Sequence, residues 1–144
     1  MEIKRLKELI KFAYQNKNQK FWLDFIIIDI NKLLTKIEFD FSEYNLFVIA
    51  VSDIRHTLLR HGKKTEKKQV AVSFDDFLLI PKIIKKFDDV KLSGYTKKTN
   101  LKTIKFTKNI NKINYVCIFE IRTGRKKLAF KTLYKKKLGK NPSL

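Results

Sequence analysis

The sequence predicts an α+β domain in which N-terminal helices are followed by a four-stranded antiparallel sheet. Helical periodicity and capping signals recur up to about residue 87, and apolar side chains alternate with polar ones from residue 90 onward. Two short polar segments, 109–112 and 122–125, separate the alternating runs as hairpin connections would. This order is typical of a sheet with its helices on one face. A length of 144 residues suits one domain, and a 44% apolar share with twelve Phe is enough to build its core.

The N-terminal part begins with a predicted amphipathic helix over residues 2–15. Lysines lie opposite an apolar stripe that consists of Ile3, Leu6, Leu9, Ile10 and Ala13. Residues 21–28 fit either a buried helix or a strand, residues 31–36 look helical, and residues 44–51 are a short apolar run. Periodicity alone does not settle this region.

Clear signals start near residue 50, and this divides the chain into three parts. We predict an N-terminal helical segment of unknown role over residues 1–49 and a main domain over residues 50–137. Residues 138–144 are expected to be a loose C-terminal tail.

Two helical regions are predicted at the start of the main domain. Ser52 is a suitable N-cap for a helix over residues 53–61, and Gly62 is a suitable residue to end it. Ser73 and Asp76 have the spacing of a capping box at the start of the second region. Pro81 fits the first turn of a helix better than its interior, so we expect two short helices or a kink there.

The predicted strands are the four alternating runs over residues 90–95, 102–107, 114–121 and 127–134. In the third strand, one face is expected to hold Tyr115, Cys117, Phe119 and Ile121. In the fourth strand, one face is expected to hold Leu128, Phe130 and Thr132.

The charge of the chain points to a polyanionic partner. Thirty-three Lys and Arg face fourteen Asp and Glu, which gives a formal net charge of +19. Such a field attracts nucleic acid first, an anionic membrane second and an acidic protein third. Small neutral substrates do not account for it.

Cysteine usage and the N-terminus favour a reducing cytoplasm. Cys117 is the single cysteine, so an internal disulfide framework is excluded. The first residues contain no uninterrupted apolar run followed by a small-residue cleavage site. The most apolar run, residues 21–30, is too short to span a bilayer. With one cysteine and two histidines, a structural zinc site is not expected.

Both histidines of the chain lie in one short segment. His56 follows Arg55, and His61 follows Arg60. Histidine accepts and returns protons near neutral pH, and arginine offers a fork of donors that suits phosphate oxygens. At 100° per residue the two histidines project about 140° apart on a helix, so one site holds both only if the helix end lies across its rim. The plain alternative is that His56 is a surface residue and His61 a helix-end residue.

Five parts of the sequence together resemble the phage-associated barnase–EndoU–colicin–RelE-like (BECR) nucleases. They are residues 52–62, Glu66 with Gln69, residues 79–81, residues 120–122 and residues 131–135. The resemblance covers roughly residues 50–137. Lys68 stands where the family has the glycine of a Gly-Gln pair, so the chain departs from the family pattern in this connector.

The resemblance implies an RNase-like fold that works without metal or other cofactor. The family's paired histidines fall on His56 and His61, and its strand positions fall on Arg122, Thr132 and Tyr134. RNA cleavage by the 2′-hydroxyl requires one group to remove a proton, another to supply one and a cation to hold the phosphorane charge. The histidines are the candidates for the proton roles and Arg122 for the clamp, with Thr132 and Tyr134 binding phosphate or orienting a histidine.

The expected substrate-binding residues are the cations around these positions: Arg55, Arg60, Arg125, Lys127, Lys131 and Lys135. The expected partner is RNA, including tRNA or another structured RNA, and an acidic immunity protein is a further candidate. No membrane partner is expected, and the predicted compartment is the cytoplasm of a bacterium or a phage-infected host. The activity would be that of a toxin or mobile-element effector.

Two other classes of function remain open. The charge of +19 suits a nucleic-acid-binding module without catalysis equally well, and it also suits an interaction protein with an acidic partner. Each site residue has a structural alternative. Arg122 could pair with Glu120, Thr132 could be strand filler, and Tyr134 could lie at the core edge.

Overall fold

The computed structural model describes residues 2–15, 22–26, 37–41, 43–44, 46–62 and 69–137. The helices are α1 (Glu2–Gln15), α3 (Val51–His61), α4 (Phe74–Phe77) and α5 (Ile80–Lys85). The strands are β1 (Trp22–Ile26), β2 (Leu46–Ala50), β3 (Gln69–Val70), β4 (Asp89–Tyr95), β5 (Lys102–Ile110), β6 (Ile113–Arg122) and β7 (Lys127–Lys137). The expected helix at 31–36 and the tail at 138–144 lie outside the described residues.

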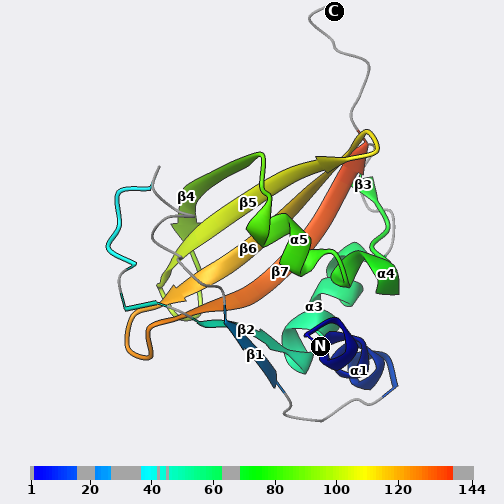
Figure 1. Cartoon of the computed structure of the whole chain (residues 1–144), viewed down its shortest axis with the longest axis horizontal. Coiled ribbons are helices and arrows are strands. Elements are labelled where there is room, and N and C mark those ends of the chain that lie inside the picture. Colours follow the sequence, from blue (N-terminus) through cyan, green and yellow to red (C-terminus); the bar gives the residue numbers. More distant parts are fainter. Residues whose placement is uncertain are drawn as a thin grey trace, which may run out of the picture.

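The sheet contains the predicted antiparallel meander and additional strands. Its order is β1-β2-β7-β6-β5-β4, with β3 also paired to β7 (Figure 1). The strands β4 to β7 match the four predicted runs, so the α+β class is confirmed. The four predicted antiparallel strands are part of a larger sheet, because β2 pairs in parallel with the start of β7 and β1 continues the sheet beyond it. The segment 1–49 is therefore not only helical, since β1 and β2 belong to it.

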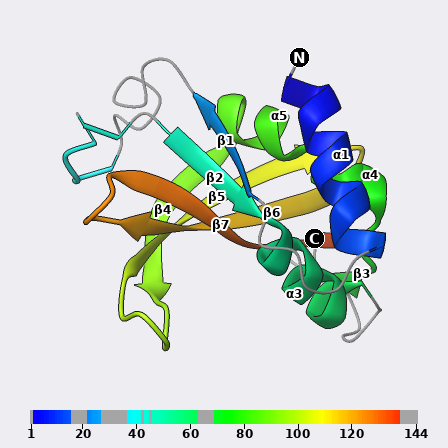
Figure 2. The same ribbon diagram turned by 90° about the horizontal axis from the view of Figure 1, so that it is seen from below.

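The helices and one face of the sheet enclose the core. The predicted stripe of α1 is buried at Leu6, Leu9, Ile10 and Ala13, and it joins the same apolar cluster as the sheet. From the strands the core receives Ile104, Phe106, Cys117, Phe119, Phe130 and Leu133. In Figure 2, α1, α4 and α5 lie above the sheet, whereas α3 and the β4–β5 hairpin extend below it. The lower face is thus available to polar side chains.

The helix ends follow the sequence signals in part. Ser73 and Asp76 form the expected capping box at α4, and Pro81 lies in the first turn of α5. Ser52 is not the N-cap of α3. Strand β2 runs directly into this helix, which begins at Val51, so its N-cap residue is Ala50. Gly62 ends α3 without adopting the left-handed conformation, with a φ of −73°. Its lack of a side chain matters instead because a Cβ atom at this position would collide with the carbonyl oxygen of Leu58.

The β5–β6 hairpin turns where the sequence predicted a connection. Asn111 and Lys112 have φ values of 51° and 64° at its tip. Two successive residues with positive φ are typical of the type I′ turn, whose twist matches that of the flanking strands. This hairpin fixes the register of β6, the strand that carries Glu120 and Arg122.

Candidate active site

A cavity of about 410 Å³ lies on the sheet face that the helices α1, α4 and α5 do not cover. Helix α3 forms one wall with His56, Arg60 and His61. The end of β4 and the following turn form the opposite wall, and β5, β6 and β7 form the floor. These parts contribute Ser93, Gly94, Tyr95, Thr96, Thr103, Ile118, Lys131 and Thr132.

The two histidines border this cavity although they project in different directions from α3. The helix packs along β7, so its C-terminal half lies across the rim of the cavity. His56 is exposed, whereas His61 is partly buried and its ring lies 5.5 Å from the ring of Tyr134. The geometry therefore meets the condition under which both histidines can face one bound ligand.

A β-bulge in β7 directs two neighbouring side chains toward the cavity. Ile118 of β6 pairs with Thr132, but the next residue, Phe119, pairs with Phe130. Lys131 is left as the extra residue, and such a bulge changes which side chains face each side of the sheet. Lys131 and Thr132 consequently both line the cavity.

The bulge overturns one expectation about face assignment in β7. Simple alternation placed Thr132 with Leu128 and Phe130. In the structure, Leu133 takes the core position after the bulge, and Thr132 lies on the other face. The hydroxyl oxygen of Thr132 is buried and has no hydrogen-bond partner within the described residues.

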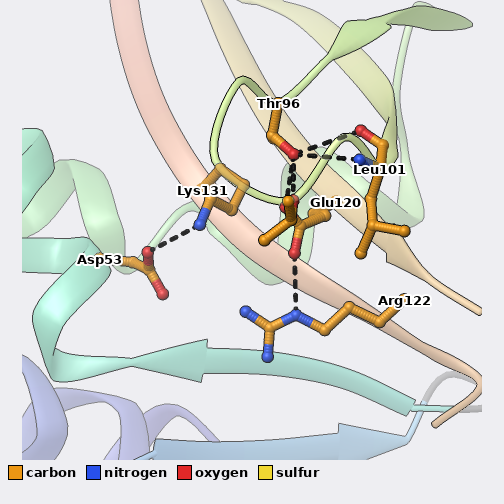
Figure 3. Close-up of polar contacts among 7 residues, drawn as sticks. Asp53, Thr96, Leu101, Glu120, Arg122 and Lys131 are labelled. Atoms are coloured by element: carbon orange, nitrogen blue, oxygen red, sulfur yellow. Dashed lines mark hydrogen bonds and ion pairs between the residues drawn. The ribbon is translucent and has the colours of Figure 1, made fainter. Parts of the chain in front are cut away.

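Asp53 and Lys131 link the helix to the bulge. The Nζ atom of Lys131 lies 3.5 Å from a carboxylate oxygen of Asp53 (Figure 3). Burial raises the pKa of Asp53, and the charges of Lys131 and Arg122 only partly offset this effect. The sequence placed Asp53 in the helix's first turn but gave no sign of this pairing.

Glu120 is a buried carboxylate, 1% exposed, that connects the cavity wall to Arg122. One oxygen accepts hydrogen bonds from the hydroxyls of Thr96 and Thr99 at 2.9 and 2.6 Å. The other accepts from Nε of Arg122 at 3.0 Å (Figure 3). Burial alone would raise the pKa of Glu120, but these hydrogen bonds and the charge of Lys131 outweigh it and lower the pKa.

The role of Glu120 was missed in the sequence, although a signal was present. Its charged side chain alternates with Phe119 and Ile121 in an apolar strand. A charge in such a position is buried only if it is paired. The pairing with Arg122 is the structural alternative to a phosphate contact by this arginine. The partners Thr96 and Thr99 follow only from the fold.

Three of the predicted basic residues lie together at a second, smaller cavity. Arg122, Arg125 and Lys127 line a space of about 170 Å³ with Val48 and Ala50. Arg122 does not line the histidine cavity, but its contact with Glu120 joins the two places.

Two other predicted basic residues are not brought to either cavity. Arg55 is partly buried on α3 and is absent from both linings. Lys135 lies on the helix-covered face, where its Nζ atom is 2.8 Å from a carboxylate oxygen of Asp76. Lys135 is 12% exposed there, so the structure does not support a substrate contact by this residue.

Two general features of the described residues bear on ligands and location. No group of three or more His, Cys, Asp and Glu side chains gathers there in a way that could hold a metal ion. No helix in this part of the chain has the length and apolar character needed to cross a membrane.

Comparison with known families gives the identity of the fold. A family model described as phage-Barnase-EndoU-ColicinE5/D-RelE like nuclease3 matches residues 25–143. The chain belongs to this nuclease family. The match extends the resemblance N-terminally to include β2 and part of β1. Searches of curated proteins and of solved structures found no match. Membership in a nuclease family gives nucleic acid as the class of substrate.

Proposed function

We propose that this nuclease is a metal-independent endoribonuclease that uses the 2′-hydroxyl of RNA as the nucleophile. The observation that carries the proposal is the presence of His56 and His61 at one cavity together with Lys131 and Thr132. These groups include two proton carriers, a cation and a hydroxyl donor, which are the parts that the reaction needs.

In the proposed reaction, one histidine removes the proton of the 2′-hydroxyl. The 2′-oxygen forms a bond to phosphorus, and the bond between phosphorus and the 5′-oxygen breaks. The other histidine donates a proton to the leaving 5′-oxygen. The products are a 2′,3′-cyclic phosphate and a 5′-hydroxyl. His61 is our first choice for the acid, since the C-terminal end of a helix favours a positive charge.

Cations beside the histidines would stabilise the negative charge that develops on the phosphorane. Arg60 and Lys131 both line the cavity. The partly buried contact of Lys131 with Asp53 holds its amino group at the bulge, which limits reorganisation during the reaction. Thr132 would donate a hydrogen bond to a phosphate oxygen. The ring of Tyr134 would orient His61.

The biological setting completes the proposal. RNA is the substrate, including tRNA or another structured RNA, and the enzyme acts as a toxin or mobile-element effector in the cytoplasm. An acidic immunity protein would inhibit it by covering the cationic cavity face.

Product analysis tests the reaction directly. The intact protein should cut RNA in excess EDTA and leave 2′,3′-cyclic phosphate ends. An otherwise identical RNA with 2′-O-methyl groups should bind without being cut, because its nucleophile is blocked. Cleavage of the methylated RNA, or cleavage that requires an added divalent metal, would rule out this mechanism. Tight, salt-dependent binding without any cleavage would instead favour the non-catalytic binding module.

A further inference from the structure

The second cavity, defined by Arg122, Arg125 and Lys127, has the chemistry of a phosphate site. Three cationic side chains line it, and none of the described lining residues is a carboxylate. Val48 and Ala50 provide an apolar floor. An anionic ligand is therefore favoured over a neutral or cationic one.

This cavity lies on the same face of the sheet as the histidine cavity. On β6, Ile118 lines the histidine cavity and Arg122 lines the second one. On β7, Lys131 and Lys127 have the corresponding positions. Four residues of strand separate the members of each pair, a distance of roughly 13 Å. This distance is about that of two nucleotides, so a strand bound at the histidines could place its second phosphate along at the second cavity.

Arg122 is held in an orientation suited to phosphate binding. Its Nε atom donates to Glu120, and Figure 3 shows its two terminal nitrogens directed away from that carboxylate. A guanidinium that is already fixed loses less conformational entropy when it binds a phosphate.

The side chains of the β6–β7 turn are divided between two environments. Arg125 and Lys127 line the cavity. Lys126, between them, pairs with Glu43 at 3.6 Å and lies over the ring of Tyr44 at 5.4 Å. The turn thus supplies two cations to the cavity and one elsewhere, and Lys126 is a matched control for charge.

We propose that Arg122, Arg125 and Lys127 form a subsite for a phosphate group two nucleotides away from the scissile one in the same strand. The preferred substrate is then an oligonucleotide that continues past the cleaved bond, rather than a dinucleotide. The identity of the strand as RNA rests on the proposed function, but binding at the subsite does not require cleavage.

Binding of 2′-O-methyl oligonucleotides of increasing length tests the subsite without any reaction. Each oligonucleotide is prepared with a 5′-phosphate, with a 3′-phosphate and with neither. We expect wild-type protein to bind one end-phosphorylated form about tenfold more tightly than its unphosphorylated twin, as one hydrogen bond between charged groups would give. Arg125→Gln and Lys127→Gln should each reduce this ratio, and Lys126→Gln should preserve it.

Three outcomes would overturn the subsite. The first is equal affinity of the wild type for the end-phosphorylated and unphosphorylated oligonucleotides. The second is an equal loss of the affinity ratio in the Arg125, Lys126 and Lys127 variants. The third is inorganic phosphate that competes as well as the end-phosphorylated oligonucleotide. Circular dichroism of each variant excludes misfolding as the cause. If the wild-type protein prefers the end-phosphorylated oligonucleotide but cuts no RNA, the proposed function alone is contradicted. If it cuts RNA but shows no such preference, the subsite alone is contradicted.

Discussion

Two buried carboxylates on opposite faces of the sheet have different roles. Asp76, 4% exposed, lies on the helix-covered side. It accepts hydrogen bonds from the backbone of Ser73 at 2.7 Å and the hydroxyl of Tyr115 at 3.0 Å, and it pairs with Lys135. Glu120, on the other side, is bonded to residues at the two cavities.

The difference shows that a buried carboxylate stabilises the fold on the helix-covered face of the sheet, whereas on the open face it can hold residues of a ligand site. The partners of Asp76 connect α4 to β6 and β7 within the core side of the fold. Burial, with the charge and hydrogen bond of Asp76, raises the pKa of Tyr115 to about 12. The partners of Glu120 instead border open space that a ligand can enter. The comparison predicts that loss of Asp76 harms folding, whereas loss of Glu120 harms activity.

The largest expected effect is the loss of stability in Asp76→Asn. The substitution removes the charge that balances Lys135 in a mostly buried place, which typically costs about 3–5 kcal/mol. Denaturant unfolding measures the change. Tyr115→Phe, which removes one hydrogen bond and no charge, should lose less. Equal stability of Asp76→Asn and wild type would contradict a stabilising role of Asp76.

Glu120→Gln should lower the rate of RNA cleavage on the order of tenfold, because misplaced groups near a reacting centre have effects of at least this size. The variant loses one negative charge, so its affinity for RNA should not fall. Single-turnover rates and dissociation constants separate the two quantities. Glu43→Gln, which removes a carboxylate with 71% side-chain exposure, is the control. A Glu120→Gln enzyme with a normal rate and lowered stability would make Glu120 merely structural, like Asp76.

Ser73→Ala should destabilise the protein by roughly 0.5–2 kcal/mol through loss of the α4 cap. The effect should be smaller than that of Asp76→Asn, because the Asp76 carboxylate keeps its bond to the backbone of residue 73. Thermal or denaturant melts measure it. A loss as large as that of Asp76→Asn would show that the Ser73 hydroxyl, not the ion pair, stabilises this region.

The smallest expected effect concerns acid stability. The folded pKa of Glu120 is lowered from its ordinary value of 4.5. Its stabilising contribution is therefore present above this value and is lost as the pH falls through the folded pKa. Unfolding free energies of wild type and Glu120→Gln should converge as the pH falls below about 4.5. Parallel curves across this range would contradict the lowered pKa.

The sequence predicted the parts of the fold that depend on local patterns. Alternation identified β4 to β7, and the spacing of Ser73 and Asp76 identified the start of α4. It did not predict the parallel pairing of β2 with β7, because an apolar run does not indicate which edge it joins. The bulge at Lys131 depends on pairing with β6, so simple alternation assigned Thr132 to the wrong face.

The candidate site was predictable only in part. The histidine segment was identified from the chemistry of its own residues and supported by the family resemblance, and Arg122 came from the resemblance. The separation of Arg122 from the histidine cavity, and the burial of Lys135 on the opposite face, depend on tertiary structure. The same is true of Thr96 and Thr99, which reach Glu120 from a distant turn.

The most direct test of the proposed nuclease function is the cleavage rate of His56→Ala and His61→Ala as a function of pH. Each variant should fold, bind RNA and cut at least about tenfold more slowly than wild type, since acid–base groups usually contribute more than that. Leu59→Ala, an exposed position on the same helix, should cut normally.

The wild-type pH profile should be bell-shaped, because one histidine must be neutral and the other protonated. The double variant should be little slower than the slower single variant, because groups that act as a unit are not additive. His56→Ala and His61→Ala proteins that fold, bind RNA and cut as fast as wild type would contradict the assignment of catalysis to this cavity.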